Sequence, residues 1–374
     1  MSLLFTPFSF HTPNGPVELP NRIVIAPMCQ YAAVNGLAND WHLTHWTSML
    51  NSGAGMFTIE ATAVSPEGRI TPACLGLWDD ATAAALDEHL ARASQLAPAM
   101  PVCIQLSHAG RKASSAKPWD GGMLITPENG GWTPLGPSAL PHLPQEAAPR
   151  ELSLEDIHRI RDDFVQAARR ARAMGIAAIE LHAAHGYLLH QFLSPLANQR
   201  QDAYGGSFDN RIRFPLEVFC AVREVFGGVL GMRVSATDWV EGGWTSEETA
   251  EFARVLKEAG AQFVHVSSGG VSPQQQIPVG PEYQVPLAKQ VKAQSGLTTL
   301  AVGLITQPAQ AEAVLQRGDA DLIALARAFL YNPRWGWQAA AELQGQVQAH
   351  PAYWRSLPRE AGGIFGPNAR IGMR

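Results

Sequence analysis

The sequence predicts an α/β fold, a (β/α)8 TIM barrel. Eight short apolar runs rich in Val and Ile read as strands buried on both faces, and helical patterns separate them. No Gly-rich turn of the kind found in dinucleotide-binding open sheets follows the first run. Eight alternations of strand and helix are the number that closes a parallel barrel. The runs span residues 22–28, 56–64, 101–108, 177–185, 229–236, 263–269, 298–305 and 322–329.

Length and composition agree with one large domain. Barrels of this kind commonly exceed about 200 residues and tolerate insertions, so the chain of 374 residues fits a single domain over residues 1–374. Hydrophobic residues make up 46% of the chain and charged residues 16%. That is enough apolar material for a large core without disulfides or metals, so the composition excludes a disordered chain.

Three segments lie outside the repeating pattern. Residues 3–19, which contain Asn14-Gly15, predict a β-hairpin that closes the bottom of the barrel. Residues 110–150 follow the third run and are rich in Gly, Pro and Trp, which predicts a lid-like excursion where active-site loops gather. The tail, residues 351–374, carries aromatic and Arg side chains, and its pattern leaves docking on this subunit, on a neighbour or on neither open.

The helices between the runs have recognisable ends. The clearest spans residues 153–174, with Ser153 as its N-cap, acidic residues in its first turn and a glycine after its end. Residues 247–259 and 309–317 predict two more helices, each followed by glycine.

Charge and cysteine content narrow the partners and the location. The net charge of -5, with no run of Lys or Arg, argues against nucleic acid and anionic membranes as partners. Four widely spaced cysteines and an N-terminus without a leader pattern predict a reducing, cytoplasmic setting. No apolar stretch reaches the roughly 20 residues that a membrane helix needs. A small molecule is therefore the expected partner.

Polar residues at the ends of the last two runs predict a phosphate site. In such barrels the working residues stand at the C-terminal ends of the strands, and phosphates bind after strands seven and eight. Gly303 lies at the end of the seventh run, and Ala326-Arg327 lies on the eighth. Arg327 would supply a bidentate charge, and the alternative is an ion pair with a carboxylate of the barrel.

The fourth run ends in two histidines and a tyrosine. His182 and His185 read as metal ligands, as donors to a substrate oxygen or as structural histidines, and substrate binding is favoured. Strand alternation places Glu180 and His182 on one face, with His185 beyond the strand. Tyr187 follows directly and is a candidate proton donor, with packing against the loop as the alternative.

Two further residues suggest a bound cofactor. Cys29 follows the first run and reads as a nucleophile, as a residue that tunes a cofactor or as a small core residue. Arg233 lies on the fifth run, where a buried charge is costly unless an anionic group meets it. Either a glutamate or a cofactor must supply that negative charge.

With these residues in order, the chain resembles the Old Yellow Enzyme family, and most closely its bacterial xenobiotic reductases and NADPH dehydrogenases. The likeness extends from Asn21 to about Trp335. The motifs that carry it are Ala-Pro-Met-Cys-x-Tyr (26–31), Glu-Ala-Thr-Ala-Val (60–64), Gln-Leu-Ser-His-Ala-Gly-Arg-Lys (105–112), His-Ala-Ala-His-Gly-Tyr-Leu (182–188) and Asn-Gln-Arg-Gln-Asp-x-Tyr-Gly-Gly-Ser (198–207).

The resemblance implies a tightly bound, non-covalent FMN, with NADPH or NADH as the reductant and no metal. Its implied ligands contact the flavin ring, the pyrimidine edge and the phosphate, and they are Ala26, Pro27, Met28, Cys29, Ala61, Gln105, Arg233, Gly303, Ala326 and Arg327. Arg233 would stabilise charge on the reduced flavin, and Cys29 would adjust its potential.

The resemblance also implies an ene-reductase. His182 and His185 would hold the carbonyl or nitro oxygen of an α,β-unsaturated substrate, Tyr187 would protonate a carbon, and Tyr31 would shape the pocket. The alternative is a flavin reductase acting on another xenobiotic class, such as nitroesters. Rival classes are a metal-dependent hydrolase using His108 with the histidine pair, a flavin-binding protein without turnover, and an isomerase or aldolase that binds a phosphorylated substrate.

The chain departs from the family pattern at several positions. Ala326 stands where glycine is frequent, which is tolerable if only its backbone N–H is used, and Val302 replaces a bulky aromatic, which predicts a roomier pocket. Family members form dimers or tetramers, so a homo-oligomer is expected. Trp354 or Arg355 is a candidate to reach a neighbouring active site, and no role is assigned to residues 356–374.

Overall fold

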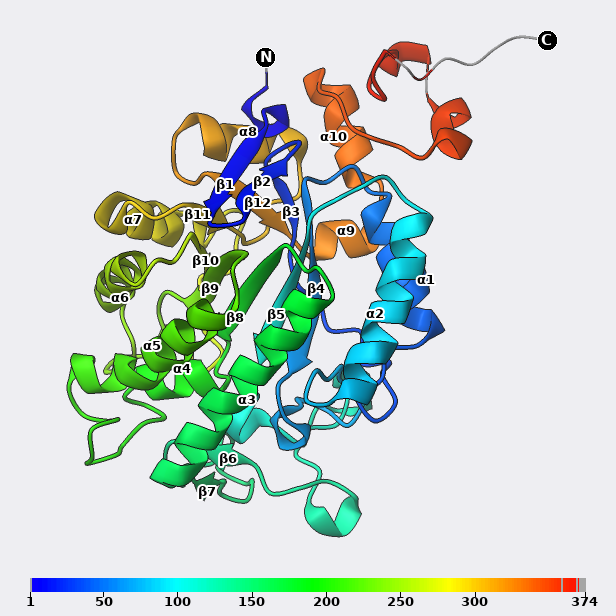
Figure 1. Cartoon of the computed structure of the whole chain (residues 1–374). Helices are drawn as coiled ribbons and strands as arrows, with labels where there is room; N and C mark the ends of the chain where they lie inside the picture. The colour runs from blue at the N-terminus through cyan, green and yellow to red at the C-terminus, as the bar shows by residue number, and fades with distance from the viewer. Residues whose placement is uncertain (1, 358, 368, 370–374) are drawn as a thin grey trace.

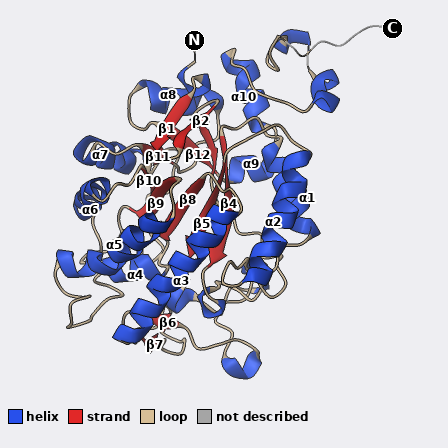
Figure 2. Ribbon diagram, viewed as in Figure 1, coloured by secondary structure: helices blue, strands red, loops and turns tan. Residues whose placement is uncertain are grey.

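The predicted barrel is present. The computed structural model describes residues 2–357, 359–367 and 369. Eight parallel strands form one closed sheet, and helices surround it (Figure 2). Around the barrel the strands follow their order in the chain: β3 (Ile23–Ile25), β4 (Met56–Ala63), β5 (Val102–Ser107), β8 (Ala178–Ala183), β9 (Val229–Ser235), β10 (Phe263–Ser267), β11 (Thr299–Ala301) and β12 (Leu322–Leu325).

The helices begin and end close to the positions that the sequence predicts. Ser153 caps the clearest helix, because its hydroxyl accepts the N–H of Asp156 at 3.1 Å. The two other predicted helices are also present, each displaced by one residue. The α-helices are α1 (Asp40–Leu50), α2 (Asp80–Gln95), α3 (Leu154–Ala173), α4 (Leu188–Leu193), α5 (Phe208–Val225), α6 (Ser246–Glu258), α7 (Val285–Ser295), α8 (Pro308–Gln316), α9 (Arg327–Tyr331) and α10 (Trp335–Leu343).

The N-terminal hairpin and the excursion lie at opposite ends of the barrel (Figure 1). The hairpin consists of β1 (Phe8–Thr12) and β2 (Gly15–Leu19), and the ring of Phe10 contacts that of Phe263 at the start of β10, with centroids 5.9 Å apart. The excursion contains the short strand β6 (Leu135–Gly136), which pairs with β7 (Arg150–Glu151). The hairpin therefore covers the N-terminal ends of the strands and leaves the C-terminal ends to the excursion.

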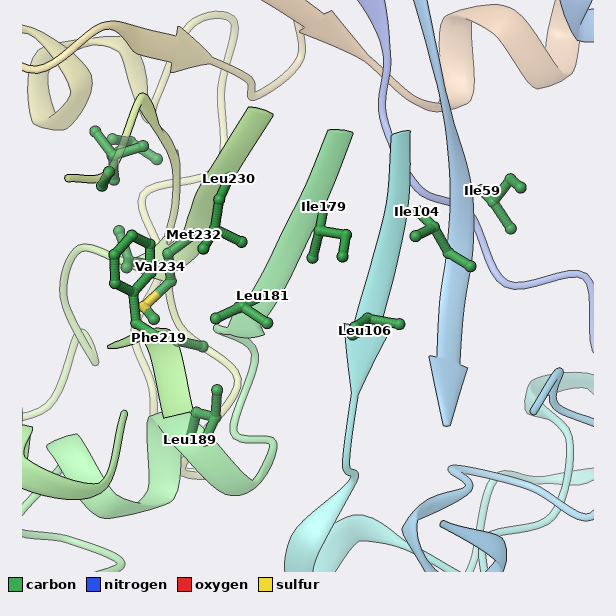
Figure 3. Close-up of a cluster of buried hydrophobic side chains, with 14 of the residues drawn as sticks. Ile59, Ile104, Leu106, Ile179, Leu181, Leu189, Phe219, Leu230, Met232 and Val234 are labelled. Atoms are coloured by element: carbon green, nitrogen blue, oxygen red, sulfur yellow. The ribbon is translucent and has the colours of Figure 1, made fainter. Parts of the chain in front are cut away.

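Alternation along the strands separates an apolar outer face from a polar interior. On β8 and β9 the buried side chains of Ile179, Leu181 and Met232 lie in the cluster that includes Leu189 of α4 and Phe219 of α5 (Figure 3). The residues between them in sequence point the other way, because the side chains of a strand alternate. The strand pattern thus turns buried polar side chains of β8 and β9 toward the barrel axis.

All eight predicted runs extend past the observed strand ends, and three of them do so by three residues or more. The first run was expected to continue to residue 28 and the seventh to residue 305, yet β3 ends at Ile25 and β11 at Ala301. The placement of Arg327 on the eighth strand was wrong, because β12 ends at Leu325 and Arg327 is the first residue of α9. A continuous apolar run has no period that distinguishes a buried strand from the helix after it.

The described part of the tail docks on its own chain, at the hairpin end of the barrel. Its residues Ile364 and Phe365 are buried in a cluster with Val347, and Phe5 packs against that cluster. The indole N–H of Trp354 donates to the carbonyl of Ala349 at 3.1 Å. Contact of Trp354 or Arg355 with a neighbouring subunit stays a prediction.

Among the described residues, no helix is both long enough and apolar enough to cross a membrane.

Candidate active site

A cavity of about 210 Å³ opens at the C-terminal end of the barrel. It is lined by Arg233, Gly303, Ala326 and Arg327, four of the residues predicted to bind a cofactor. Gly303 has φ = 125°, and a Cβ there would lie 2.9 Å from the side-chain nitrogen of Gln284. A larger residue at position 303 would therefore be strained and would crowd the wall of the cavity.

Arg327 has no carboxylate partner among the described residues. Every Arg–carboxylate pair within 4.0 Å in this part of the chain involves another arginine. The alternative reading of Arg327 as a structural ion pair thus has no support. Its position on the cavity wall, which residues 303–306 also line, suits an anionic ligand.

Arg233 is buried, and no carboxylate of the described residues lies within ion-pair distance of it. Its side chain comes from β9, and its Nε has no hydrogen-bond partner. The nearby Glu180 is already engaged, because its two carboxylate oxygens are bound by Gln105 Nε2 and His265 Nδ1, each at 2.7 Å. Glu180 therefore does not fully neutralise the charge of Arg233, and a bound anionic group would fit beside this arginine.

His182, His185 and Tyr187 lie together at the mouth of the barrel. The ring of His182 is perpendicular to that of His185, with centroids 5.1 Å apart, and lies 4.9 Å from that of Tyr187. His182 Nδ1 accepts the N–H of Ala184 at 3.3 Å, which leaves the ring proton on Nε2. His182 therefore presents a donor with no other partner among the described residues.

His185 is more firmly engaged than the sequence suggests. Its Nε2 lies 2.8 Å from the hydroxyl of Ser267, which is itself 3.3 Å from the side-chain oxygen of Gln284. Because Gln284 accepts the hydroxyl proton, His185 donates to Ser267. His185 must exchange this bond to contact a substrate.

Both histidines are neutral, and the tyrosine keeps its proton. Burial first, and the charge of Arg233 second, lower the pKa of His182 and of His185 well below the ordinary value. Burial raises the pKa of Tyr187 well above its ordinary value. At neutral pH the cluster thus offers neutral N–H and O–H donors.

The turn that carries His185 and Tyr187 packs tightly against the loop after β10. His185 has φ = 59° and Gly186 φ = 74°, and a Cβ on Gly186 would lie 2.1 Å from the carbonyl oxygen of Gly270. Only glycine fits this approach. The ammonium of Lys112 reinforces it by donating to the carbonyls of His185 at 2.9 Å and Gly270 at 3.1 Å.

The sequence did not reveal a buried network behind this turn. His190 Nδ1 accepts the N–H of Gly186 at 2.9 Å, so its Nε2 carries the proton and donates to Asp238 at 2.8 Å. Asp238 also accepts the hydroxyl of Ser194 at 2.6 Å and the N–H of Trp244 at 2.7 Å. The Asp238 carboxylate thus fixes the tautomer of His190 and, through it, the turn.

Replacing Asp238 with Asn is expected to lower the free energy of unfolding by about 2–3 kcal/mol. If the amide oxygen of the new side chain keeps the bonds from Ser194 and Trp244, its NH₂ group faces the Nε2–H of His190, and two donors oppose each other. If the His190 proton moves to Nδ1 so that Nε2 can accept, the N–H of Gly186 loses its acceptor. Urea unfolding measures the loss, with Asp87→Asn on the exposed side of α2 as the control, and equal stabilities would contradict the network.

Cys29 lies in an apolar cluster with other predicted site residues. Ala61 is buried in this cluster, and Tyr31 and Tyr187 pack against it. Burial, and next the neighbouring Cys74, raise the pKa of Cys29 well above its ordinary value. The thiol is therefore neutral, which is the opposite of what a nucleophilic cysteine needs.

Glu60 holds the loop after β3 in place. Its carboxylate accepts the N–H of Gln30 at 2.7 Å, within the loop that carries Cys29 and Tyr31. Burial raises the pKa of Glu60 to about 8, against the opposing effect of that hydrogen bond. Tyr31 has φ = 51°, and its ring packs edge-on against Trp119 of the excursion, with centroids 5.7 Å apart. The excursion thus reaches the predicted pocket.

The remaining predicted cofactor ligands lie outside the lining of the 210 Å³ cavity. These residues are Ala26, Pro27, Met28, Cys29, Ala61 and Gln105. Val302, in contrast, lines it beside Gly303 and is 9% exposed. The structure thus places the predicted phosphate ligands and Arg233 around one cavity, and the predicted ring ligands elsewhere at the same end of the barrel.

His108 makes its hydrogen bond within its own loop. Its Nδ1 accepts the N–H of Gly110 at 3.0 Å, and its ring packs on Gly68. Among the described residues, no three His, Cys, Asp or Glu side chains are arranged to hold a metal ion.

The fold and these side chains define a class of protein. The closed parallel barrel has a cavity at its C-terminal end, and two arginines that line it, Arg233 and Arg327, pair with no carboxylate in the described part of the chain. This arrangement is suited to a phosphorylated cofactor that carries negative charge. The comparisons specify the class: the model of the NADH:flavin oxidoreductase / NADH oxidase family matches residues 3–346. The chain belongs to this family and, within it, to the Old Yellow Enzymes. It is an FMN-dependent NAD(P)H oxidoreductase.

Curated relatives and solved structures agree. The chain is 43% identical over 356 residues to the NADPH dehydrogenase of Bacillus licheniformis, covering 94% of this chain and 98% of that one. It is 41% identical to the NADPH dehydrogenase of Geobacillus thermodenitrificans, with 95% and 98% covered. Morphinone reductase in complex with tetrahydroNAD superposes with a TM-score of 0.74 at 26% identity, covering 92% of each chain. An old yellow enzyme homologue from Zymomonas mobilis gives 0.71 at 25%, covering 92% of this chain and 94% of that one.

Proposed function

We propose that this oxidoreductase reduces the activated carbon–carbon double bond of α,β-unsaturated carbonyl or nitro compounds. The observation that supports the proposal is the cluster of two neutral histidines and a protonated tyrosine near the cavity. Such a substrate needs a hydrogen-bond donor at its oxygen and a proton donor at a carbon, and the cluster contains both.

The residues around the cavity are suited to FMN. Gly303, Ala326 and Arg327 would hold its phosphate, and Arg233 would face its pyrimidine edge, where the Nε without a partner gains an acceptor. The loop from Ala26 to Cys29, with Ala61 and Gln105, would contact the ring. FMN, when bound and reduced, supplies the hydride.

His182 and His185 would bind the substrate oxygen. The Nε2–H of His182 has no other partner among the described residues and donates directly, while His185 donates once it exchanges its bond to Ser267. Neutral imidazoles serve this purpose, because the proton stays on the ring while the hydrogen bond withdraws electron density from the double bond. Burial, with the charge of Arg233 second, lowers the pKa of both histidines and keeps both rings neutral.

Tyr187 would protonate the carbon next to the polarised group. Its hydroxyl makes no hydrogen bond to any described residue, and its ring lies against His182. A pKa raised by burial keeps the proton on the phenol until a carbanion-like centre forms. Tyr31 and Trp119 would border the same space.

Absorption spectra of the purified protein test this function. Flavin bands are expected to bleach on anaerobic addition of NADPH and to return on addition of 2-cyclohexenone. Bands that return only with a nitrate ester would move the activity to the other xenobiotic class. Bands that bleach and return only with oxygen would show a flavoprotein without the proposed substrate.

A further inference from the structure

A second cavity, of about 250 Å³, lies within the excursion beside the candidate active site. It is lined by Arg111, Lys112, Met123, His142 and Glu146, among others. Lys112 connects it to the active site, because the same ammonium donates to the carbonyl of His185. The cavity therefore lies one side chain away from the turn that carries the proposed donors.

The lining carries two cations, Arg111 and Lys112, and one carboxylate, that of Glu146, so its net charge is positive. Neither Arg111 nor Lys112 has a carboxylate within 4.0 Å among the described residues, and Glu146 accepts the N–H of Leu143 at 3.1 Å. Burial lowers the pKa of Lys112 to about 8, with a further lowering from Arg111. The pKa of Arg111 itself falls to about 10, again through burial. The carboxylate of Glu146 opposes both shifts only in part, so two adjacent buried cations face a single carboxylate in the lining, and it lies beyond ion-pair distance.

Polar side-chain atoms in the lining also lack hydrogen-bond partners among the described residues. Arg111 is 7% exposed and its Nε makes no hydrogen bond, and neither does Nδ1 of His142. The guanidinium donates to the carbonyls of Val271 at 2.6 Å, Leu140 at 3.3 Å and Pro141 at 3.5 Å. Lys112 uses two carbonyls, which leaves one of its three protons. Carbonyl dipoles tie the loops together, but they do not neutralise two charges.

We propose that this cavity binds a phosphate group of the nicotinamide dinucleotide. A phosphate supplies the negative charge and the acceptor oxygens that Arg111, Lys112 and His142 lack. The nicotinamide must reach the mouth of the barrel to give up its hydride, and this cavity adjoins that mouth through Lys112, so it is a candidate site for a phosphate of the same molecule. The inference rests on the proposed placement of the reaction at this mouth. The pyrophosphate and the 2′-phosphate share the required chemistry.

Met123→Glu tests the proposal with a repulsive charge. Met123 is 46% exposed, so a polar side chain is tolerated, and Met123→Gln is the matched neutral control. Stopped-flow flavin reduction is compared for NADPH and for 1-benzyl-1,4-dihydronicotinamide, which carries the same ring without phosphate. We expect the apparent Kd of NADPH to rise about tenfold in Met123→Glu and that of the benzyl compound to stay unchanged.

NADH identifies the phosphate. A tenfold rise for NADPH alone assigns the 2′-phosphate, and a rise for both dinucleotides assigns the pyrophosphate. An unchanged Kd for NADPH, or an equal rise with the benzyl compound or in Met123→Gln, would overturn the proposal. These measurements stop at the reduced flavin, so a failure of the proposed alkene reduction, which appears only on reoxidation, is seen separately.

Discussion

Replacing Tyr187 with Phe is expected to slow alkene reduction about a hundredfold or more, while flavin reduction by NADPH remains almost unchanged. The variant removes only the hydroxyl, so the ring still packs against His182 and under Lys112. Hydride transfer to the alkene then leaves a carbon with no acid in place, and water must take over. Reduction by NADPH needs no proton from this chain and should not respond.

Stopped-flow measurement of the two half-reactions checks this expectation. Tyr353→Phe is a suitable control, because Tyr353 lies in the tail, where its ring contacts that of Trp337 with centroids 5.6 Å apart. Equal losses in both half-reactions would mean that Tyr187 shapes the flavin site. Unchanged alkene reduction would leave the proton to another group or to solvent.

Replacing Arg233 with Met is expected to have opposite effects on the apoprotein and on FMN binding. In the FMN-free chain the guanidinium is buried and forms no ion pair with any residue that the structure describes, so an apolar side chain of similar length should stabilise the fold by about 1–3 kcal/mol. The same change removes charge-assisted bonds to the flavin and should weaken FMN binding about a hundredfold. Loss of the charge should also raise the pKa of His182, because Arg233 helps to lower it.

Urea unfolding of the apoprotein and quenching of FMN fluorescence measure the two effects on the same preparation. Arg169→Met, at an exposed position of α3, controls for the loss of one positive charge. A less stable apoprotein would show that Glu180 does pair with Arg233 in solution. An unchanged FMN affinity would remove Arg233 from the flavin site.

The sequence alone determined the class of fold. It also determined that the functional residues lie at the C-terminal end of the barrel. Eight apolar runs with helices between them have few alternatives, because each run must be buried on both faces. The candidate residues were found for the same reason. His182, Arg233 and Gly303 lie on or just beyond strands whose C-terminal ends meet in a barrel, so their proximity follows from topology.

The exact ends of the strands did not follow from the sequence. The eighth apolar run continued through Arg327 without a change of period, and only the backbone at Ala326, with φ = -110° and ψ = -87°, shows that the strand has ended. The number of strands depends on the pattern of a whole segment, whereas the end of a strand depends on local dihedral angles. A sequence pattern therefore predicts the number of strands far better than the residue at which each strand ends.

Only the tertiary structure decided how the site residues are partnered. The sequence left open whether a glutamate or a cofactor meets the charge of Arg233. In the structure Gln105 and His265 bind the carboxylate of Glu180, and no carboxylate of the described residues lies within 4.0 Å of the arginine. The hydrogen bonds of Asp238, and those of Arg111 and Lys112 in the excursion, join segments that are far apart in the chain. Hydrogen-bond partners are fixed by distances of a few tenths of an ångström, and a sequence carries no such distances until the chain has packed.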